Sequence, residues 1–317
     1  MIPESELPGL GAVMGDGNYG EVFLLDRGET VYKRYKPDTL HGVAHAQARF
    51  LETLVHAPAG WEADVRDLVL DSVVWPTHTV VAEDGAALGV VMPRIPREFE
   101  VNSERDTGEK PRFSRLGVLF EPPGSTLRIS SLEDPSPGDW VRVAVEVAVL
   151  VAALHRVGIV IGDVSAQNVL VTPRDQGAGR RVMIIDSDSF RPVGMASPVP
   201  QRSSEHWMAI EHLLARRDDM AAPAGSAKHR AAQARLSTCT LESDVFKLGL
   251  LVVRCLATDW AVSRHSAFPV RRGDVGAVVS GHLGARAVDA VWAALAPDAG
   301  DRPTAVEVAL ALAGAAR

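Results

Sequence analysis

The sequence predicts an α+β protein with a small β-rich N-terminal lobe and a larger, mainly helical C-terminal lobe. Short β-forming runs separated by turn residues fill much of residues 10–96. A helix with apolar residues on all sides is expected from Asp139 to Val157, where it ends before Gly158. A chain of 317 residues is also long enough for a large core divided between two lobes.

The first β-forming runs surround a glycine-rich turn. Up to residue 36 the chain is expected to form three strands, joined by a glycine turn and then by the turn Asp26–Glu29. The turn glycines Gly15, Gly17 and Gly20 follow the pattern GxGxxG, which alone is weak evidence because glycines mark many turns. A dinucleotide-binding fold would need a helix directly after these glycines. β-forming residues follow instead, so a β-hairpin is expected.

One helix and further strands follow. The helix is expected over residues 43–55, and the strands over Leu68–Trp75, His78–Val81 and Leu88–Met92. Pro93–Pro96 is expected to be a linker between the lobes. Residues 97–138 are polar and rich in Pro and Gly, so we expect an extended, partly mobile wrap over that linker. Farther on, the Ala-rich residues 215–238 are expected to form a helical or disordered surface insert.

Composition and charge exclude several classes of protein. The apolar content of 46% and the charged content of 23% are ordinary for a globular protein. The net charge of −7 argues against a dedicated nucleic-acid binder, whose surface is usually basic. Two cysteines are too few for a disulfide framework, and with no signal peptide a cytoplasmic location is expected. The longest apolar stretch, Val141–Leu154, is too short to span a bilayer, so membrane insertion is not expected.

Two runs in the middle of the chain carry the strongest functional signal. In the run VIGDVSAQNVLV, Asp163 stands five residues before Asn168, on a loop that leads into an apolar strand. In the run MIIDSDSF, a second apolar strand ends in Asp186. Either Asp could simply be a turn former, and the Asn could be a cap. The order and spacing resemble the protein kinase family, with Ile-Gly-Asp for His-Arg-Asp and Asp-Ser-Asp for Asp-Phe-Gly.

Other segments resemble the same family in the same order. They are LHRVGIV at 154–160, SSEHWMAIE at 203–211, SDVFKLG at 243–249 and APDAGDRPT at 296–304. The resemblance therefore runs from about residue 10 to residue 310, and it implies a two-lobed protein-kinase-like fold. The implied N-lobe is 1–96, and the implied C-lobe is 97–317, including the wrap and the Ala-rich insert. It also implies that Glu211 pairs with Arg302 and that Asp244 braces the catalytic loop.

The resemblance implies roles at an active site. Asp163 would be the base that accepts the proton of a hydroxyl, and Asn168 and Asp186 would hold Mg²⁺. Lys33 would pair with the phosphates of ATP, although Lys36 is a nearby competitor. The implied nucleotide-binding residues are Gly15, Gly17, Gly20, Val22, Val31, Lys33, Glu52, Met92, Ile95 and Leu170.

Several positions depart from the family pattern. Gly162 replaces an Arg, so a phosphate on the activation segment has no obvious cation to order it. Ser187 replaces the Phe that packs beneath the N-lobe helix, and Asp188 replaces a Gly and adds a carboxylate near the metals. Ser165 replaces a Lys near the γ-phosphate.

The carboxylate that would hold Lys33 is also ambiguous. Glu52 is the only carboxylate in the helix expected over residues 43–55, and a surface glutamate is an equally good interpretation of it. Gln47, earlier in the same helix, is the alternative, and it would replace an ion pair by a hydrogen bond.

The resemblance implies a bacterial Ser/Thr protein kinase that uses ATP and Mg²⁺. Its partners would be a protein substrate and a regulatory or scaffold protein, and not nucleic acid. The alternative is a pseudokinase that binds nucleotide or a partner without catalysis, supported by the departures at Gly162, Ser165 and Ser187. A small-molecule kinase of the same fold ranks third, because such enzymes usually lack the segments that resemble A-x-E, S-D-x-x-x-x-G and R-P-T.

Overall fold

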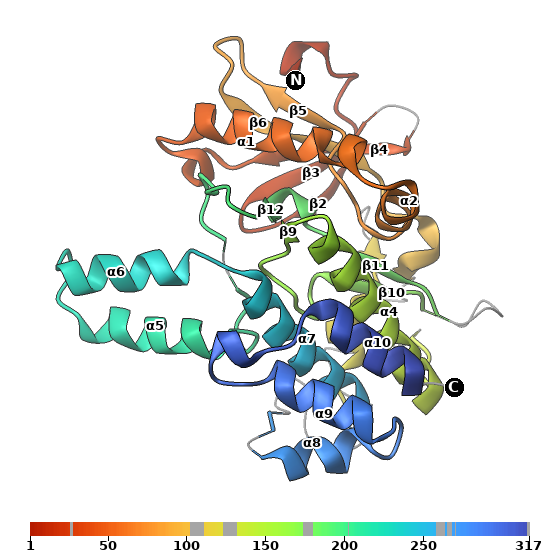
Figure 1. Cartoon of the computed structure of the whole chain (residues 1–317). Coiled ribbons are helices and arrows are strands. Elements are labelled where there is room, and N and C mark those ends of the chain that lie inside the picture. The colour runs from red at the N-terminus through yellow and green to blue at the C-terminus, as the bar shows by residue number, and fades with distance from the viewer. Residues whose placement is uncertain are drawn as a thin grey trace.

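The computed structural model describes residues 1–25, 28–101, 111–122, 132–173, 180–201, 203–257, 264, 268–269 and 271–315. The expected turn at Asp26–Glu29 lies partly outside these residues. The described chain forms a β-rich N-terminal part above a larger helical part (Figure 1). This arrangement confirms the predicted α+β fold class, while the lobe boundary at residue 96 remains a prediction.

A six-stranded sheet, in the order β1-β5-β6-β4-β3-β2, forms the N-terminal part. Its strands are β1 (Ile2–Pro3), β2 (Val13–Asp16), β3 (Gly20–Leu24), β4 (Thr30–Tyr35), β5 (His78–Val81) and β6 (Ala87–Pro93). The strand β4 is central, and its Lys33 lies opposite Val22 of β3 and Val90 of β6. The helix α1 (Ala44–His56) covers the sheet with buried side chains spaced for one helical face, such as Phe50 and Leu54 (Figure 1).

The expected strand Leu68–Trp75 is wrong, because most of it lies in the helix α2 (Ala63–Ser72). The buried residues Val65, Val69 and Val73 are four positions apart, which is a helical spacing. The apolar residues of the segment predicted as a strand include Leu68 and Leu70, which are exposed. After α2 the chain becomes extended, and the Val74 amide donates to the carbonyl of Ile184 at 2.9 Å.

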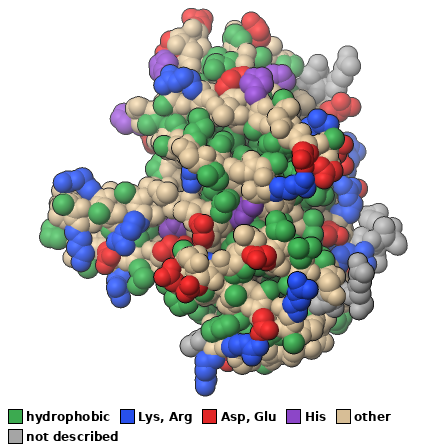
Figure 2. All heavy atoms as spheres, viewed as in Figure 1, with side chains coloured by type: hydrophobic (Ala, Val, Ile, Leu, Met, Phe, Trp, Pro, Cys, Tyr) green, Lys and Arg blue, Asp and Glu red, His purple; other side chains and the backbone are tan. Residues whose placement is uncertain are grey.

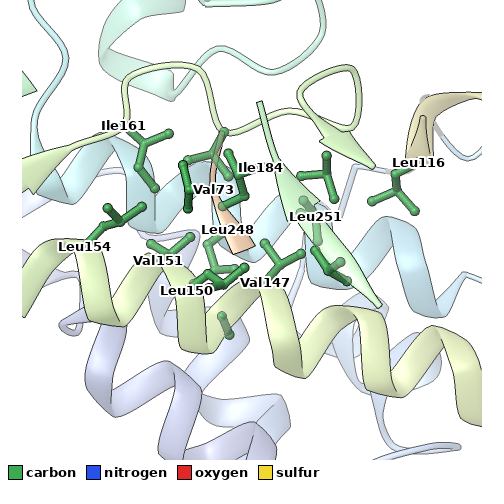
Figure 3. Close-up of a cluster of buried hydrophobic side chains, with 14 of the residues drawn as sticks. Val73, Leu116, Val147, Leu150, Val151, Leu154, Ile161, Ile184, Leu248 and Leu251 are labelled. Carbon is green, nitrogen blue, oxygen red and sulfur yellow. The ribbon is translucent and has the colours of Figure 1, made fainter. Parts of the chain in front are cut away.

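The helix α4 (Pro137–Arg156) is the centre of the C-terminal part. It begins with a capping box between Ser136 and Asp139, and it packs against α7 (Leu241–Leu256) and α10 (Ala305–Ala315). Figure 3 shows Val147, Leu150, Val151 and Leu154 of α4 facing Leu248 and Leu251 of α7. The helices α8 (Arg272–Val279) and α9 (Ala285–Ala294) complete this layer.

A pair of helices, α5 (Ile210–Ala221) and α6 (Ala227–Leu236), occupies the Ala-rich insert. The pair projects from the side of the molecule, and Lys and Arg side chains are spread over it (Figures 1 and 2). The insert is therefore helical.

The described part of residues 97–138 is more tightly packed than an extended wrap. It contains the paired strands β7 (Glu100–Val101) and β8 (Arg112–Phe113) and the short helix α3 (Leu116–Leu119). Phe99, Leu116 and Phe120 are fully buried. Residues 102–110 and 123–131 of the expected wrap lie outside the described residues.

Short strand pairs hold the loops between the two parts. The strand β9 (Ile159–Val160) pairs with β12 (Arg191–Pro192), and β10 (Val169–Val171) pairs with β11 (Val182–Ile184). The remaining elements are the 3₁₀ turns η1 (Glu4–Glu6), η3 (Pro37–Leu40), η4 (Ala57–Gly60), η5 (Arg97–Phe99), η6 (Ser187–Ser189) and η8 (Ala299–Asp301). None of the helices in the described ranges has the length and apolar character needed to cross a membrane.

The strands β4 and β6 approach each other closely at Gly89, and a substitution there can test the register of the sheet. A Cβ on Gly89 of β6 would lie 2.1 Å from the Lys33 carbonyl oxygen, so Gly89→Ala must displace β4. We expect Gly89→Ala to lower the free energy of unfolding by about 1–3 kcal/mol, measured by chemical denaturation. The matched control is Gly273→Ala in α8, where a Cβ has no neighbour within 4 Å and should be neutral or stabilising. Equal stability of the two variants would contradict this register.

Candidate active site

Asp163 and Asn168 lie on the loop between β9 and β10. Asp244 of α7 is fully buried beneath this loop, and it accepts hydrogen bonds from the backbone amides of Ile161 at 2.7 Å and Gly162 at 2.9 Å. His155 Nε2 lies 3.3 Å from the same carboxylate. Asp244 therefore braces the loop as the resemblance implied, because a carboxylate that accepts several hydrogen bonds fixes its donors.

The residue before Asp163 has to be glycine. Gly162 has a φ of +81°, a conformation that L side chains rarely adopt. A Cβ at this position would also lie 2.6 Å from Gln201 Nε2. An Arg at this position would therefore need a different backbone conformation and a displaced Gln201.

Asp163 is held by three protein donors. Its Oδ1 accepts from the Ser204 amide at 2.8 Å, and its Oδ2 accepts from the Ser204 hydroxyl at 2.7 Å. Asn168 Nδ2 donates to the same Oδ2 at 2.9 Å and to the Asp163 carbonyl at 3.1 Å. Both contacts of Asn168 use its nitrogen, so the amide oxygen is the atom that it would offer to a metal ion.

Asp186 follows β11 in a left-handed conformation, with φ 65° and ψ 33°. This conformation is uncommon outside glycine, although Asp tolerates it better than most residues, and such strain is concentrated at functional sites. The Asp186 side chain is 53% exposed and its Oδ1 lies 3.1 Å from Lys33 Nζ. The Lys33 ammonium holds the pKa of Asp186 below its usual range, against the opposing effect of desolvation.

Lys33, and not Lys36, reaches the acidic residues of the site. Lys33 Nζ contacts Asp186 and also Asp188, whose Oδ1 lies 2.8 Å away. Burial alone would lower the pKa of Lys33, but the charges of Asp188 and then Asp186 outweigh burial and hold this pKa above its ordinary value. Lys36 is more exposed and pairs with Asp16 at 3.0 Å.

Glu52 does not hold Lys33, which corrects that expectation. Glu52 Oε1 accepts from the N-terminal ammonium at 3.1 Å and from His56 Nε2 at 2.9 Å, so the carboxylate faces away from the site. Gln47 occurs five residues earlier, which turns it toward a different side of α1, and it lines the same cavity as Lys33. Gln47 does not hold Lys33 either, because its Oε1 has no hydrogen-bond partner among the described residues, whereas Lys33 contacts Asp186 and Asp188.

A cavity of about 780 Å³ lies between the lobes. Lys33, Asp163, Asn168 and Asp186, which come from three separate places in the sequence, all line it. The structure therefore gathers the four residues that sequence reasoning placed closest to the chemistry.

The glycine turn covers this cavity with its tip. The Gly17 amide donates to the Gly20 carbonyl at 2.9 Å, which closes the β2–β3 hairpin, and Asn18 and Tyr19 line the cavity. Gly15 lies opposite Val22 in this hairpin. A Cβ on Gly20 would lie 2.4 Å from the Arg34 carbonyl oxygen, so Gly20 serves the sheet as well as the turn.

The apolar residues among those implied to bind nucleotide belong to the hydrophobic core and do not line that cavity. Val31 and Met92 lie opposite each other on β4 and β6, and both are buried with Leu170 in the main core. Val22 and Ile95 are partly buried and pack against the same core. Their role in nucleotide binding therefore stays a prediction.

Sequence reasoning missed the contribution of Tyr35. Its hydroxyl donates to Asp188 Oδ2 at 2.8 Å. Burial, and then the charge of Asp188, raises the pKa of Tyr35 well above its ordinary value, so the phenol keeps its proton. Lys33 and Tyr35 are two residues apart on one strand and therefore share a face, which is the only signal that the sequence contains.

The space of the family's Phe is filled differently. Ser187 is fully buried and its hydroxyl donates to the Val74 carbonyl. Phe190, three residues later, packs edge-on against Trp75 with a centroid distance of 5.9 Å. Two contacts thus replace the family's usual apolar contact. They are the hydrogen bond of Ser187 to the backbone and the packing of Phe190 against Trp75.

The donor set suits Mg²⁺. Asn168 and Asp186 offer oxygen atoms, and Mg²⁺ is usually held by one or two carboxylates together with phosphates and water. Across the residues that the structure describes, no group of three His, Cys, Asp or Glu side chains could hold a metal by itself. The oxygens of a bound phosphate and water would complete a site made by Asn168 and Asp186.

A second predicted pair supports the C-lobe. Arg302 donates from Nη1 and Nη2 to the two carboxylate oxygens of Glu211, at 2.9 and 2.7 Å. Burial raises the pKa of Glu211, but the hydrogen bonds from Arg302 and from the backbone, together with the charge of Arg302, outweigh burial and leave this pKa lowered. The pairing that the resemblance implied is confirmed.

No protein family model matches the sequence, and no curated protein matches it. Solved structures do match. A kinase-domain structure of PknI from Mycobacterium tuberculosis is 16% identical, with a TM-score of 0.53 over 97% of this chain and 96% of that one. A cysteine mutant of the same domain is 15% identical, with a TM-score of 0.56 over 96% of this chain and 94% of that one. The chain therefore has the protein kinase fold.

Proposed function

We propose that this protein is a Ser/Thr protein kinase that uses ATP and Mg²⁺. The observation that carries the proposal is that Lys33, Asp163, Asn168 and Asp186 line one cavity of a protein-kinase fold. These are the residue types that phosphoryl transfer requires, because this chemistry depends mainly on positioning and on neutralising charge. The structural similarity to the PknI kinase domain adds support.

Each residue has a role that its surroundings can support. Asp163, oriented by Ser204 and Asn168, would accept the proton of the acceptor hydroxyl as the hydroxyl oxygen bonds to the γ-phosphorus. The bond between the γ-phosphorus and the oxygen that bridges it to the β-phosphate would break in the same step, and ADP would leave. Lys33 would contact the phosphates. Mg²⁺, held by Asn168 and Asp186, would neutralise phosphate charge. Ser204 stands where the family has its activation-segment Thr, which favours Ser or Thr over Tyr as acceptor.

The first test concerns nucleotide binding. A ligand that binds only the native state raises the melting temperature, so Mg-ATP should stabilise this protein against thermal unfolding. We expect Lys33→Met to reduce that shift, because it removes the cation expected to contact the phosphates. Lys36→Met is the matched control and should keep the shift. No shift of the wild-type protein at millimolar Mg-ATP would argue against a nucleotide site.

The second test separates catalysis from binding. Asp163→Asn is nearly isosteric, and loss of a positioned base typically costs roughly 100- to 10,000-fold in rate. We expect this variant to keep its affinity for ATP within a few-fold but to lose phosphoryl transfer from labelled ATP. If wild type and variant both bind ATP and both transfer nothing, the pseudokinase alternative replaces the kinase.

The third test concerns the metal. Asp186→Asn removes one of the two charges beside Lys33 and the carboxylate expected to bind Mg²⁺. We expect transfer to be abolished over the whole range of Mg²⁺ concentrations, measured in the labelled-ATP assay. Retained transfer with an unchanged Mg²⁺ requirement would place the metal ligand elsewhere. Asp289→Asn, an exposed change in α9, is the control.

A further inference from the structure

Asp188 makes the shorter of the two contacts with Lys33. Its Oδ1 lies 2.8 Å from Lys33 Nζ, compared with 3.1 Å for Asp186. Its Oδ2 accepts from the Tyr35 hydroxyl, also at 2.8 Å. The Asp188 side chain is 5% exposed, whereas that of Asp186 is 53% exposed. Two carboxylates that contact the same ammonium therefore have different surroundings.

These surroundings determine which of the two carboxylates a metal ion could reach. Both oxygens of Asp188 are occupied by donors from one face of β4, so Asp188 is fixed between Lys33 and that strand. Asp186 is open to the cavity, where a metal ion could approach it. If Lys33 and Asp186 turned toward a bound phosphate and its metal, Asp188 would remain as the counter-charge of the lysine.

The helix α1 supplies no carboxylate to Lys33. In other protein kinases a helix glutamate holds this lysine, and the position of the helix controls activity. Here Gln47 lines the cavity, 4% exposed, and its Oε1 has no hydrogen-bond partner among the described residues. Glu52 is engaged with the N-terminus and His56.

We propose that Asp188 is the positioning residue that holds Lys33 for phosphate binding, in place of the helix glutamate. The inference rests on the proposed kinase function, because it assigns Asp188 a role at the same site. Asp186 and Asp188 belong to one short segment that follows β11 and includes η6. The anchor of the lysine and the proposed metal ligand therefore move together, and the position of α1 does not determine whether Lys33 is anchored.

The main competing role for Asp188 is that of another metal ligand. The two roles predict different results from one set of variants. An anchor acts through Lys33, so its loss should weaken nucleotide binding without changing the Mg²⁺ requirement. A ligand acts through the metal, so its loss should raise the Mg²⁺ concentration needed for half-maximal binding.

The experiment measures Mg-ATP affinity by calorimetry, with the Mg²⁺ dependence, for a matched set of full-length variants. We expect Asp188→Asn to weaken affinity at least tenfold with an unchanged Mg²⁺ midpoint. Adding Gln47→Glu should recover most of the loss, because it returns a carboxylate to the cavity wall in nearly the shape of the glutamine. Asp71→Asn, an exposed change in α2, is the charge-matched control and should bind as wild type.

Wild-type affinity in Asp188→Asn, a raised Mg²⁺ midpoint, or no recovery in the double variant would each overturn the proposal. Circular dichroism and melting temperature establish that the variants are folded. If Asp188→Asn does not fold, Tyr35→Phe replaces it. This variant keeps both charges and removes one bond to Asp188, so we expect a few-fold loss of affinity, and wild-type affinity would count against the anchor.

The readout also separates this proposal from the kinase proposal. The affinity for Mg-ATP can be measured without phosphoryl transfer. If the wild-type protein binds Mg-ATP but transfers no phosphoryl group, the kinase proposal is overturned, and the role of Asp188 in binding is still tested. A wild-type protein that does not bind Mg-ATP overturns both.

Discussion

The two lobes meet at Lys33, whose ammonium lies between Asp186 and Asp188. These partners are 153 and 155 residues away in the sequence, on the segment that follows β11. Removing a lysine from water costs several kcal/mol unless a counter-charge compensates it, and here both counter-charges come from the opposite lobe. The sheet can therefore bury Lys33 only while the Asp186–Asp188 segment stays against β4.

That segment is fixed by contacts that do not involve charge. The Ser187 hydroxyl donates to the Val74 carbonyl, and Phe190 packs against Trp75. Val74 and Trp75 both belong to the extended chain after α2, whose Val74 amide bonds to β11. Below the segment, Asp244 fixes the Asp163 loop through two backbone amides. Buried acids and backbone donors thus determine the geometry on both sides of the cavity, which agrees with the rule that buried polar groups are paired.

Sequence reasoning succeeded where short spacing determines chemistry. The five-residue separation of Asp163 and Asn168 places both on one loop, and the structure joins them by a hydrogen bond. The Glu211–Arg302 pair and the Asp244 brace followed from the resemblance and are present. The strand expected at Leu68–Trp75 is wrong because its short apolar run is compatible with either a strand or a helix. Only the burial of Val65, Val69 and Val73 shows that the fold uses the helical spacing.

The physical reason why the partner of Lys33 could not be predicted is different. The contact of Asp188 depends on the left-handed φ of Asp186 and on burial against Tyr35, and neither is encoded by a local pattern. The glutamine on α1 and the extra aspartate look like two unrelated departures from the family. They compensate each other at the level of charge. A helix glutamate and one aspartate would give the lysine two counter-charges, and Asp186 with Asp188 gives it the same number. Charge balance around a buried cation is thus preserved while the element that supplies the charge changes.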